Sequence, residues 1–318
     1  MDYINQTTPL QFILIGLSTD MYLQKIYFVI FLIMYLATVT GNVLIIIVVR
    51  SNSKLNTAMY FFISNLSFVD LCFSSAIVPK LLVNTLAKDK SISFLGCATQ
   101  MYFHLALGGT ECVLLAIMAF DRYVAICNPL RYNTIMSKQI CIQLAVGTWC
   151  ANFINSISHA FFTFQLPFCR TNHVNHYFCE MPPLFRLSCK DTLTNEIAVY
   201  VSGGLVALCA FALIIMSYVK IISTVLKIQS TDGRYKAFST CASHLAVVCL
   251  YYGTISFIYM RPRNTYSPEK DRAVSIIYTV VTPMVNPLIY SIRNQEVKGS
   301  LRRMFTTKSF PHVPRSGR

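Results

Sequence analysis

Charged residues are scarce in this chain of 318 residues, of which only 13% are Asp, Glu, Lys or Arg. Soluble domains average about 25% charged residues, so the composition disfavours a water-soluble fold. Acidic residues are fewest, 13 against 27 basic ones, which gives a net charge of +14. Basic chains can bind nucleic acid, but such proteins are rarely 54% hydrophobic with a mean hydropathy of +0.52. The composition instead predicts a membrane protein whose loops on one side are basic.

The few charges leave seven long runs that contain at most one charged residue each. A helix needs about 20 mostly apolar residues to cross the hydrocarbon core of a bilayer, which is about 30 Å thick. The runs are continuous rather than alternating, so they predict helices and not the strands of a barrel. We therefore expect an all-α, seven-transmembrane helix bundle formed by residues 26–49, 55–79, 91–120, 139–169, 197–219, 237–260 and 273–292.

The basic residues divide unequally between the two sides of this expected bundle. Segments 50–56, 121–138, 220–236 and 293–318 share one side and hold 16 basic and 3 acidic residues, against 11 and 8 on the other. Basic loops stay in the cytoplasm, so we expect a single domain 1–318 with 1–25 extracellular, 26–292 as the bundle and 293–318 as a cytoplasmic tail. Asn5 begins an N-glycosylation sequon on the expected outer side.

Four of the 12 cysteines fall on the expected outer side, where the compartment is oxidising. Cys97, Cys169, Cys179 and Cys189 can form two disulfides in three possible pairings. If all four are paired, one of the three cysteines in the loop 168–196 must reach Cys97. No spacing of cysteines and histidines matches a metal site, so we expect no metal bound by these residues.

Two acidic residues, Asp70 and Glu111, lie inside expected spans, where an ionisable group is costly and is a functional candidate. Two acids in one low-dielectric interior either share a proton or bind a cation such as Na⁺. We expect an interior cation or proton site that tunes conformation, with unrelated polar contacts and an ion conduit as alternatives. No nucleophile and base have the spacing of an active site, so we do not expect an enzyme.

One face of the third expected span carries polar groups at helical spacing. His104, Gly108, Glu111 and Arg122 follow the 3.6-residue period, so this face is expected to point into the bundle. A face with an acid, a glycine and a cation at its inner end is unsuited to lipid contact. The third span is therefore expected to line the functional interior.

The seventh expected span contains Pro287, which cannot donate to the carbonyl of Pro283 four residues earlier. We expect the helix to break there, with the neighbouring Asn286 satisfying the freed group. A broken helix at that depth is tolerated only against protein or water, so this place is a reasonable hinge. Beyond it, a short amphipathic helix on the inner membrane surface is expected from apolar residues at helical spacing, Val297, Leu301, Met304 and Phe305.

Several sequence strings carry a family signature over nearly the whole chain. They are GN at 41–42, MYFF at 59–62, SNLS at 64–67, MAFDRYVAIC at 118–127, SY at 217–218, KAFSTCASHL at 236–245 and PMVNPLIYSIRN at 283–294. The strings of the third and sixth spans are highly specific in combination. On these strings the chain resembles a rhodopsin-like (class A) G-protein-coupled receptor, and within that class an olfactory (odorant) receptor. Ala58 departs from the family, which usually has proline at this point.

The resemblance implies a receptor that binds an odorant from outside and activates a stimulatory, olfactory-type G protein inside, raising cAMP. It further implies residence in the plasma membrane, in the cilia of olfactory sensory neurons. By similarity, Cys97 is implied to pair with Cys179 and Cys169 with Cys189. Two rival classes are a rhodopsin-like receptor for a lipid or peptide, which would lack the sixth-span string, and a transporter or channel. The second would show internal repeats and paired broken helices, which the sequence lacks.

The resemblance also implies a set of residues that couple the bundle to the G protein. Arg122 is the implied cytoplasmic switch, first held by Asp121 and later facing the G protein. Tyr218 and Tyr290 are implied to move with it, and His244 to join spans three and six at their inner ends. The implied coupling set comprises Asp121, Arg122, Tyr123, Tyr218, His244, Asn286, Pro287 and Tyr290.

The pocket is expected in the outer half of the bundle, beneath the loop that carries Cys179. A mostly apolar cavity with a few hydroxyl and imidazole groups suits a small, mostly apolar ligand with one oxygen function. No pocket position except the deeper Glu111 carries an acid, so an amine ligand is disfavoured. The expected partners are an odorant, a heterotrimeric G protein and membrane lipid, without nucleic acid. The expected ligand-binding residues are His104, Leu105, Gly108, Gly109, Cys112, Ser202, Val206, Ile255, Ser256, Tyr259 and Thr279.

Overall fold

A computed structural model describes residues 10–169, 171–259, 267–293 and 297–300. Seven of its helical segments are long and apolar enough to cross a membrane. They are α1 (Met21–Ser51), α2 (Ala58–Leu86), α3 (Phe94–Cys127), α5 (Lys138–Phe164), α7 (Leu193–Val225), α8 (Thr231–Tyr259) and the joined segment of α9 (Pro268–Ile276), the π-helical η4 (Ile277–Val281) and α10 (Thr282–Arg293). The predicted all-α, seven-helix class is confirmed.

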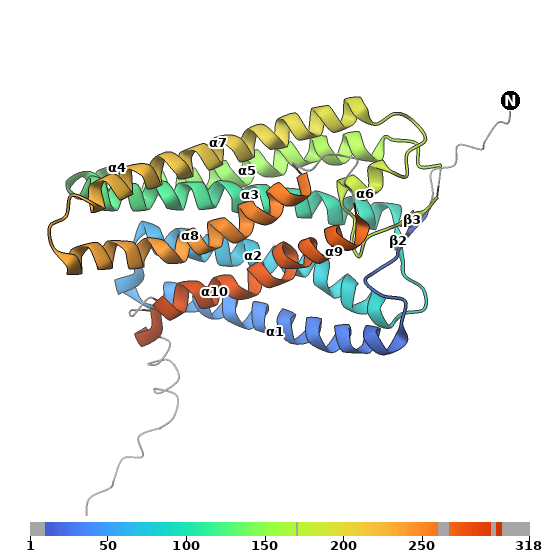
Figure 1. The fold of residues 1–318 in the computed structure, drawn as a ribbon, viewed down its shortest axis with the longest axis horizontal. Helices are drawn as coiled ribbons and strands as arrows, with labels where there is room; N and C mark the ends of the chain where they lie inside the picture. Colours follow the sequence, from blue (N-terminus) through green and yellow to red (C-terminus); the bar gives the residue numbers. More distant parts are fainter. Residues whose placement is uncertain (1–9, 170, 260–266, 294–296, 301–318) are drawn as a thin grey trace, which may run out of the picture.

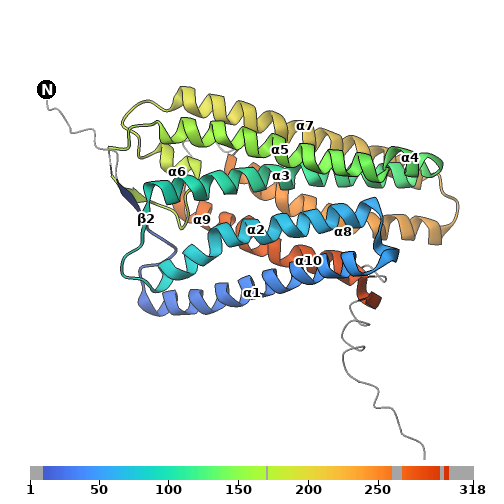
Figure 2. The ribbon, with the colours of Figure 1, turned by 180° about the vertical axis from the view of Figure 1, so that it is seen from behind.

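The long helices lie side by side along one axis, and short elements cover the two ends (Figure 1). One end, here called the disulfide end, holds β1 (Gln11–Leu14), β2 (Ser91–Ser93), β3 (His173–Val174) and α6 (Met181–Phe185). The other, here called the α4 end, holds η1 (Ser53–Leu55), η2 (Pro129–Arg131) and α4 (Tyr132–Ile135). Viewed from behind, α3 runs between α2 and α5 (Figure 2). Because α3 also packs on α7 and α8, it has buried residues along its whole length.

Several helices extend beyond the runs that the sequence marked out, because a charged residue does not by itself end a helix, whereas α5 ends at Phe164, five residues before its run does. The first helix begins at Met21 and not at residue 26, since Asp20 caps it by accepting from the backbone N–H groups of Tyr22 and Leu23. The third helix likewise continues through Arg122 to Cys127. The expected boundary between residues 25 and 26 therefore falls inside a helix.

A small sheet at the disulfide end was not expected from the sequence. Its order is β2-β1-β3, with β1 antiparallel to β2 and parallel to β3. Phe12 and Leu14 of β1 are fully buried, and the ring of Phe12 packs against those of Phe94 and Phe168. The segment before α1 is thus a structural strand that closes one end of the bundle.

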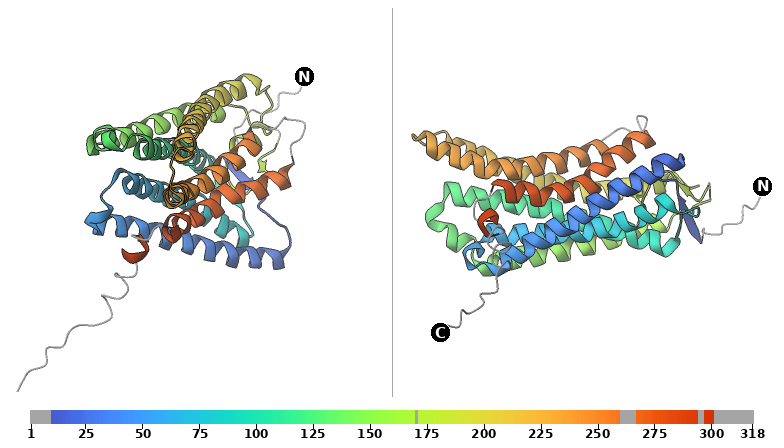
Figure 3. Two further views of the ribbon diagram at one scale, coloured as in Figure 1. Left: turned by 60° about the vertical axis from the view of Figure 1, so that its left-hand side comes forward. Right: turned by 90° about the horizontal axis from the view of Figure 1, so that it is seen from below.

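The seventh span is irregular at two places. A π-helical turn joins α9 to α10, and Pro287 lies inside α10. Residues 297–300, which follow the seventh span, are helical, and Val297 is buried there. The other apolar positions of the expected amphipathic helix, at 301, 304 and 305, lie outside the described residues. Seen from below, α10 lies beside α1 and α8 (Figure 3).

The carbonyl that Pro287 leaves without its usual donor is satisfied from another helix. Asn42 of α1 donates through Nδ2 to the carbonyl of Pro283 at 3.0 Å, while Asn286 donates elsewhere. The expectation that Asn286 fills this role was wrong, because its side chain points toward Asp70. Gly41 permits the contact, since a Cβ there would lie 3.0 Å from the Pro287 ring. Helix α1 is thus fastened to the break in α10.

We predict that Asn42→Ala lowers the stability of the protein by about 1 kcal/mol, because a buried carbonyl loses its donor. Thermal unfolding of the detergent-solubilised protein measures the loss as a lower apparent melting temperature. Asn65→Ala is the matched control, because Asn65 donates only to the carbonyl of Phe61 within its own helix. Equal melting temperatures for the two variants would contradict the proposed fastening.

Candidate functional site: a cavity and its connections

A cavity of about 380 Å³ lies between α3, α5, α7 and α8, toward the disulfide end. Nine of the eleven residues expected to bind ligand line it. Ser202 and Thr279 do not line it. The hydroxyl oxygen of Ser202 lies 3.1 Å from Nε2 of His159, and the hydroxyl oxygen of Thr279 lies 2.8 Å from the hydroxyl oxygen of Tyr177. The lining nine are His104, Leu105, Gly108, Gly109, Cys112, Val206, Ile255, Ser256 and Tyr259.

The two adjacent glycines of α3 have different roles. A Cβ on Gly109 would collide with the side-chain oxygen of Asn152, so Gly109 lets α5 pack closely against α3. A Cβ on Gly108 would meet only ordinary contacts, with Phe73 and Tyr251. The carbonyl of Gly108 accepts from the hydroxyl of Tyr251 in α8. Close helix packing accounts for Gly109, whereas Gly108 lines the cavity without a close contact.

Helix α5 supplies a wall of the cavity that sequence reasoning missed. Its side chains Asn152, Asn155, Ser156 and His159 line the cavity. Asn152, Ser156 and His159 lie at helical spacing, so the signal was present as a polar stripe on an otherwise uncharged span. Tyr200, Gly203, Gly204 and Ala207 of α7 were missed as well, since an apolar helix of even composition does not reveal which face is inward.

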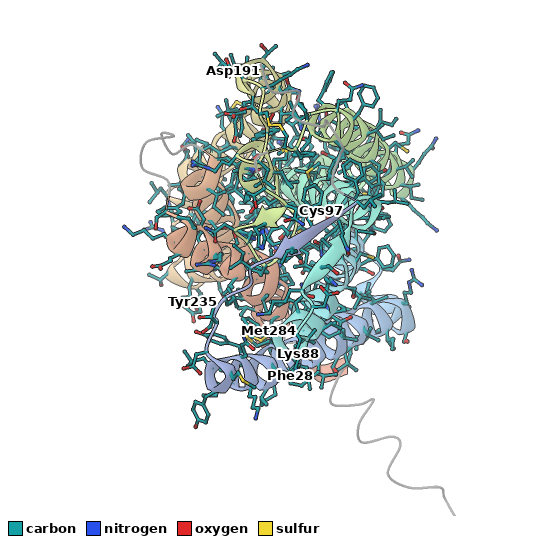
Figure 4. All side chains as sticks on the ribbon, turned by 90° about the vertical axis from the view of Figure 1, so that its right-hand side faces the viewer. Phe28, Lys88, Cys97, Asp191, Tyr235 and Met284 are labelled. Carbon is teal, nitrogen blue, oxygen red and sulfur yellow. A yellow bond between two sulfur atoms is a disulfide. The ribbon has the colours of Figure 1, made fainter. Side chains whose placement is uncertain are left out.

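Two disulfides hold the loop that covers the cavity. Cys97 is bonded to Cys179 and Cys169 to Cys189, with Cα atoms 5.4 and 5.7 Å apart, which is the pairing that the resemblance implied. In the view onto this end, Cys97 lies near the centre of the face, beside the N-terminal strand (Figure 4). The backbone N–H of Cys179 also donates to the side-chain oxygen of Gln100 at 2.9 Å. The loop is therefore fixed to the top of α3.

The residue after Cys179 is a buried acid that the sequence analysis did not select. Glu180 is 2% exposed, and its Oε1 accepts from the hydroxyls of Tyr259 in α8 and Tyr278 in η4, each at 2.9 Å. Burial raises the pKa of Glu180 to about 7, with a smaller contribution from the charge of Asp271. One loop carboxyl thus joins the sixth and seventh spans above the cavity.

Two histidines lie near this carboxyl. Nε2 of His176 is 3.6 Å from Oε2 of Glu180, and Nε2 of His104 is 4.0 Å from Oε1. Burial lowers the pKa of His176 to about 3, so its imidazole is neutral where the protein functions. The contact between His104 and the loop explains why this cavity residue is 5% exposed.

The two intramembrane acids, Asp70 and Glu111, lie deeper in the bundle, and both are buried. Asp70 accepts through Oδ2 from Nδ2 of Asn286 at 3.0 Å, which joins α2 to α10. Five buried oxygens of this interior have no hydrogen-bond partner among the described residues: Asn42 Oδ1, Asp70 Oδ1, Ser74 Oγ, Glu111 Oε1 and Asn286 Oδ1. Carboxylate, amide and hydroxyl oxygens without donors fit a hard cation or a shared proton.

A second polar network lies toward the α4 end. His244 of α8 places Nε2 3.0 Å from the carbonyl of Leu115 in α3 and Nδ1 2.8 Å from the hydroxyl of Tyr218 in α7. Because a carbonyl only accepts, Nε2 carries the proton and Nδ1 accepts from Tyr218. The side chain therefore joins three helices, one more than the resemblance implied.

The remaining coupling residues lie close to this network. Arg122 is buried, and Tyr290 is buried with a hydroxyl that has no hydrogen-bond partner among the described residues. Oδ1 of Asp121 accepts from the hydroxyl of Tyr132 in α4 at 2.8 Å, a contact that the sequence did not indicate. The hydroxyl of Tyr123 lies 3.4 Å from Nδ2 of Asn128. Asp121 is thus held by the connection that follows α3.

The comparisons with known proteins decide the family. The olfactory receptor family model matches residues 31–308. The chain belongs to the olfactory receptor family. It is 49% identical to the canine (Canis lupus familiaris) olfactory receptor-like protein OLF3 over 94% of this chain and 95% of that one. It is also 48% identical to human (Homo sapiens) olfactory receptor 5AU1, over 96% and 84%, and 47% identical to mouse (Mus musculus) olfactory receptor 5G29, over 98% and 99%.

Family membership fixes the general activity of this olfactory receptor. It is a G-protein-coupled receptor embedded in a membrane by several passes, and it is not an enzyme. The cavity and the two polar networks are therefore parts of a signalling bundle. Helices α3, α7 and α8 each contribute to both the cavity and the His244 network, so three helices link the two places.

We predict a pH dependence of stability that depends on Glu180. Its carboxyl has a raised pKa in the folded receptor, so the folded state binds the proton more tightly than the unfolded chain. The stability that the folded receptor gains from this bound proton is fully present below about pH 4.5, and it is lost as the pH rises through about 7. Wild type should therefore lose stability relative to Glu180→Gln as the pH rises from 5 to 8. Thermal unfolding at several pH values measures the difference, and a difference that is constant with pH would contradict the assignment.

Proposed function

We propose that this olfactory receptor binds a small, mostly apolar odorant with one oxygen function in the cavity beneath the Cys179 loop. The observation that carries the proposal is a cavity of about 380 Å³, lined mainly by apolar and aromatic side chains with a few polar groups. Cavities of this kind are typical of small-molecule sites. Its closure by the disulfide-bonded loop and by Glu180 suits ligands small enough to enter a covered site.

Activation is proposed to be a shift between two arrangements of the bundle, driven by a ligand that fits one arrangement better. Tyr252 and Tyr259 of α8 line the cavity, and His244 on the same helix holds α3 and α7 together near the α4 end. A ligand that displaces α8 at the cavity therefore strains the His244 network. Release of that network moves α8 and Arg122 relative to one another and opens the site for a stimulatory, olfactory-type G protein, which raises cAMP.

The orientation in the membrane belongs to the same proposal. The excess of basic residues in the segments of the α4 end supports a cytoplasmic location for that end and for the tail 293–318. The disulfide end, with residues 1–25, is then extracellular, in agreement with its two disulfides. We propose a single receptor domain 1–318 in the plasma membrane, in the cilia of olfactory sensory neurons. Asn5, the proposed glycosylation site, lies outside the described residues.

The interior acids are proposed to hold a cation or a shared proton. The five oxygens without hydrogen-bond partners come from α1, α2, α3 and α10, so an occupant would tie four helices together in one arrangement. A ligand-induced change that separates these helices would release it. The occupant then acts as a second ligand that opposes the odorant.

We predict that Arg122→Ala abolishes odorant-induced cAMP while the receptor still reaches the cell surface. The side chain is buried at the α4 end, where the G protein is proposed to dock. A cAMP reporter in cells that express the olfactory-type G protein measures the response to an odorant panel, with surface labelling in parallel. Arg50→Ala, at the exposed end of α1, is the control and should signal normally. A normal cAMP response from Arg122→Ala would refute this role.

We predict that replacing choline with Na⁺ at constant ionic strength raises the apparent melting temperature of the wild-type receptor. Glu111→Gln should remove this effect, because it removes one of the acids that face the occupant. Glu269→Gln changes an exposed acid in α9 and should leave the Na⁺ effect intact. A wild-type melting temperature that follows pH but not Na⁺ would assign the site to a shared proton.

A further inference from the structure

His159 of α5 is a buried histidine of the cavity wall, and one of its two ring nitrogens makes no hydrogen bond with the described residues. It is 5% exposed and lines the cavity. Its Nε2 lies 3.1 Å from the hydroxyl oxygen of Ser202 in α7, while its Nδ1 has no hydrogen-bond partner among the described residues. A buried polar atom without a partner is costly, so a ligand that satisfies it gains the interaction; because Nδ1 has almost no accessible surface in this structure, the imidazole ring must turn toward the cavity for the ligand to reach it.

The hydrogen bonds of Ser202 determine what this nitrogen can do. The Ser202 hydroxyl lies 2.9 Å from the carbonyl oxygen of Ala198, and a carbonyl only accepts, so the serine donates its single hydrogen there. Toward His159 the hydroxyl oxygen must then accept, which places the imidazole proton on Nε2. In a neutral imidazole the other nitrogen is an acceptor. Nδ1 of His159 is therefore a lone pair that lacks a donor.

Four other hydroxyls of the cavity wall have already donated their hydrogens to the protein, whereas that of Ser256, which also lines the cavity, has no hydrogen-bond partner among the described residues. Ser156 donates to the carbonyl of Asn152 at 2.8 Å, and Tyr252 to the carbonyl of Cys112 at 3.2 Å. Tyr259 and Tyr278 both donate to Glu180. Toward a ligand, these four hydroxyl oxygens can therefore act only as hydrogen-bond acceptors. This part of the wall favours a ligand that brings its own hydrogen-bond donor.

We propose that this receptor recognises odorants that are alcohols, and that the O–H group of the alcohol donates a hydrogen bond to Nδ1 of His159. The inference rests on the proposed function, since it names the ligand chemistry of the same cavity. Ser202 acts as a positioning residue, because it sets the imidazole tautomer without lining the cavity. Gly203, whose absent Cβ would lie 3.5 Å from Cε1 of His159, leaves space beside the ring edge for the incoming hydroxyl.

Matched probes test the ligand class directly. Each set holds an alcohol with its ketone and its methyl ether, such as menthol with menthone and menthyl methyl ether, or cyclohexanol with cyclohexanone and methoxycyclohexane. The three members share shape and differ in whether they carry a donor. In the cAMP assay, we expect the alcohol of a responsive set to be about tenfold more potent than either partner, which is the effect of one hydrogen bond.

Three variants separate the hydrogen bond from a general effect on the cavity. His159→Asn keeps an acceptor near the position of Nδ1 and should retain the preference for the alcohol. His159→Gln places its amide near the position of Nε2, so it should lose the preference about tenfold. Ser202→Ala frees the imidazole to move its proton to Nδ1, so the ketone should gain potency and the alcohol should lose it. Surface labelling establishes that each variant is folded and exported.

The outcomes distinguish this inference from the proposed function. Equal potency of alcohol, ketone and ether at a responding wild-type receptor overturns the inference and leaves the odorant function standing. An unchanged alcohol preference in both His159→Gln and Ser202→Ala also overturns it. A receptor that reaches the surface and responds to no set, nor to a wider odorant panel, contradicts the proposed function and this inference together.

Discussion

The structure depends on one constraint, which is that polar groups placed in a bilayer must find their partners inside the protein. The bundle meets it in part with hydrogen bonds between helices. Asn42 supplies the donor that Pro287 takes away from the carbonyl of Pro283, and His244 bridges three helices through its two ring nitrogens. Each of these contacts stabilises one arrangement of the helices. Each must also change if a second arrangement is to form.

Some of the places where the constraint is not met coincide with the proposed functional sites. The buried atoms without partners include oxygens around Asp70 and Glu111 and a nitrogen of the cavity residue His159. Helix α3 passes between these places, because it bears Glu111 and packs against α5, which bears His159. Glu180 adds a third level above the cavity, where it joins Tyr259 to Tyr278. The proposed ligand would thus lie between two polar layers, both of which include residues of the seventh span.

The helix class and the family were predictable from the sequence because both reside in local patterns. Uncharged runs show spans, and strings such as that at 118–127 are read without knowing any contact. Nine cavity residues followed from helical faces and family position. The sequence did not reveal Glu180, because the role of this loop acid depends on hydrogen bonds from two tyrosines that lie on other segments of the chain. The partner of Pro283 was wrongly assigned to Asn286 for the same reason, because adjacency in the chain does not determine where a side chain points.

The N-terminal strand imposes an order on how the receptor is made. β1 pairs with β2 near residue 92 and with β3 near residue 173, so its two partners are synthesised long after it. Until the first four spans have been inserted, Phe12 and Leu14 have no core to enter. The strand is the first part of the described chain to emerge and among the last to find its place. Loss of this short segment would remove the central strand of the sheet, which joins the start of the third span to the loop held by the two disulfides.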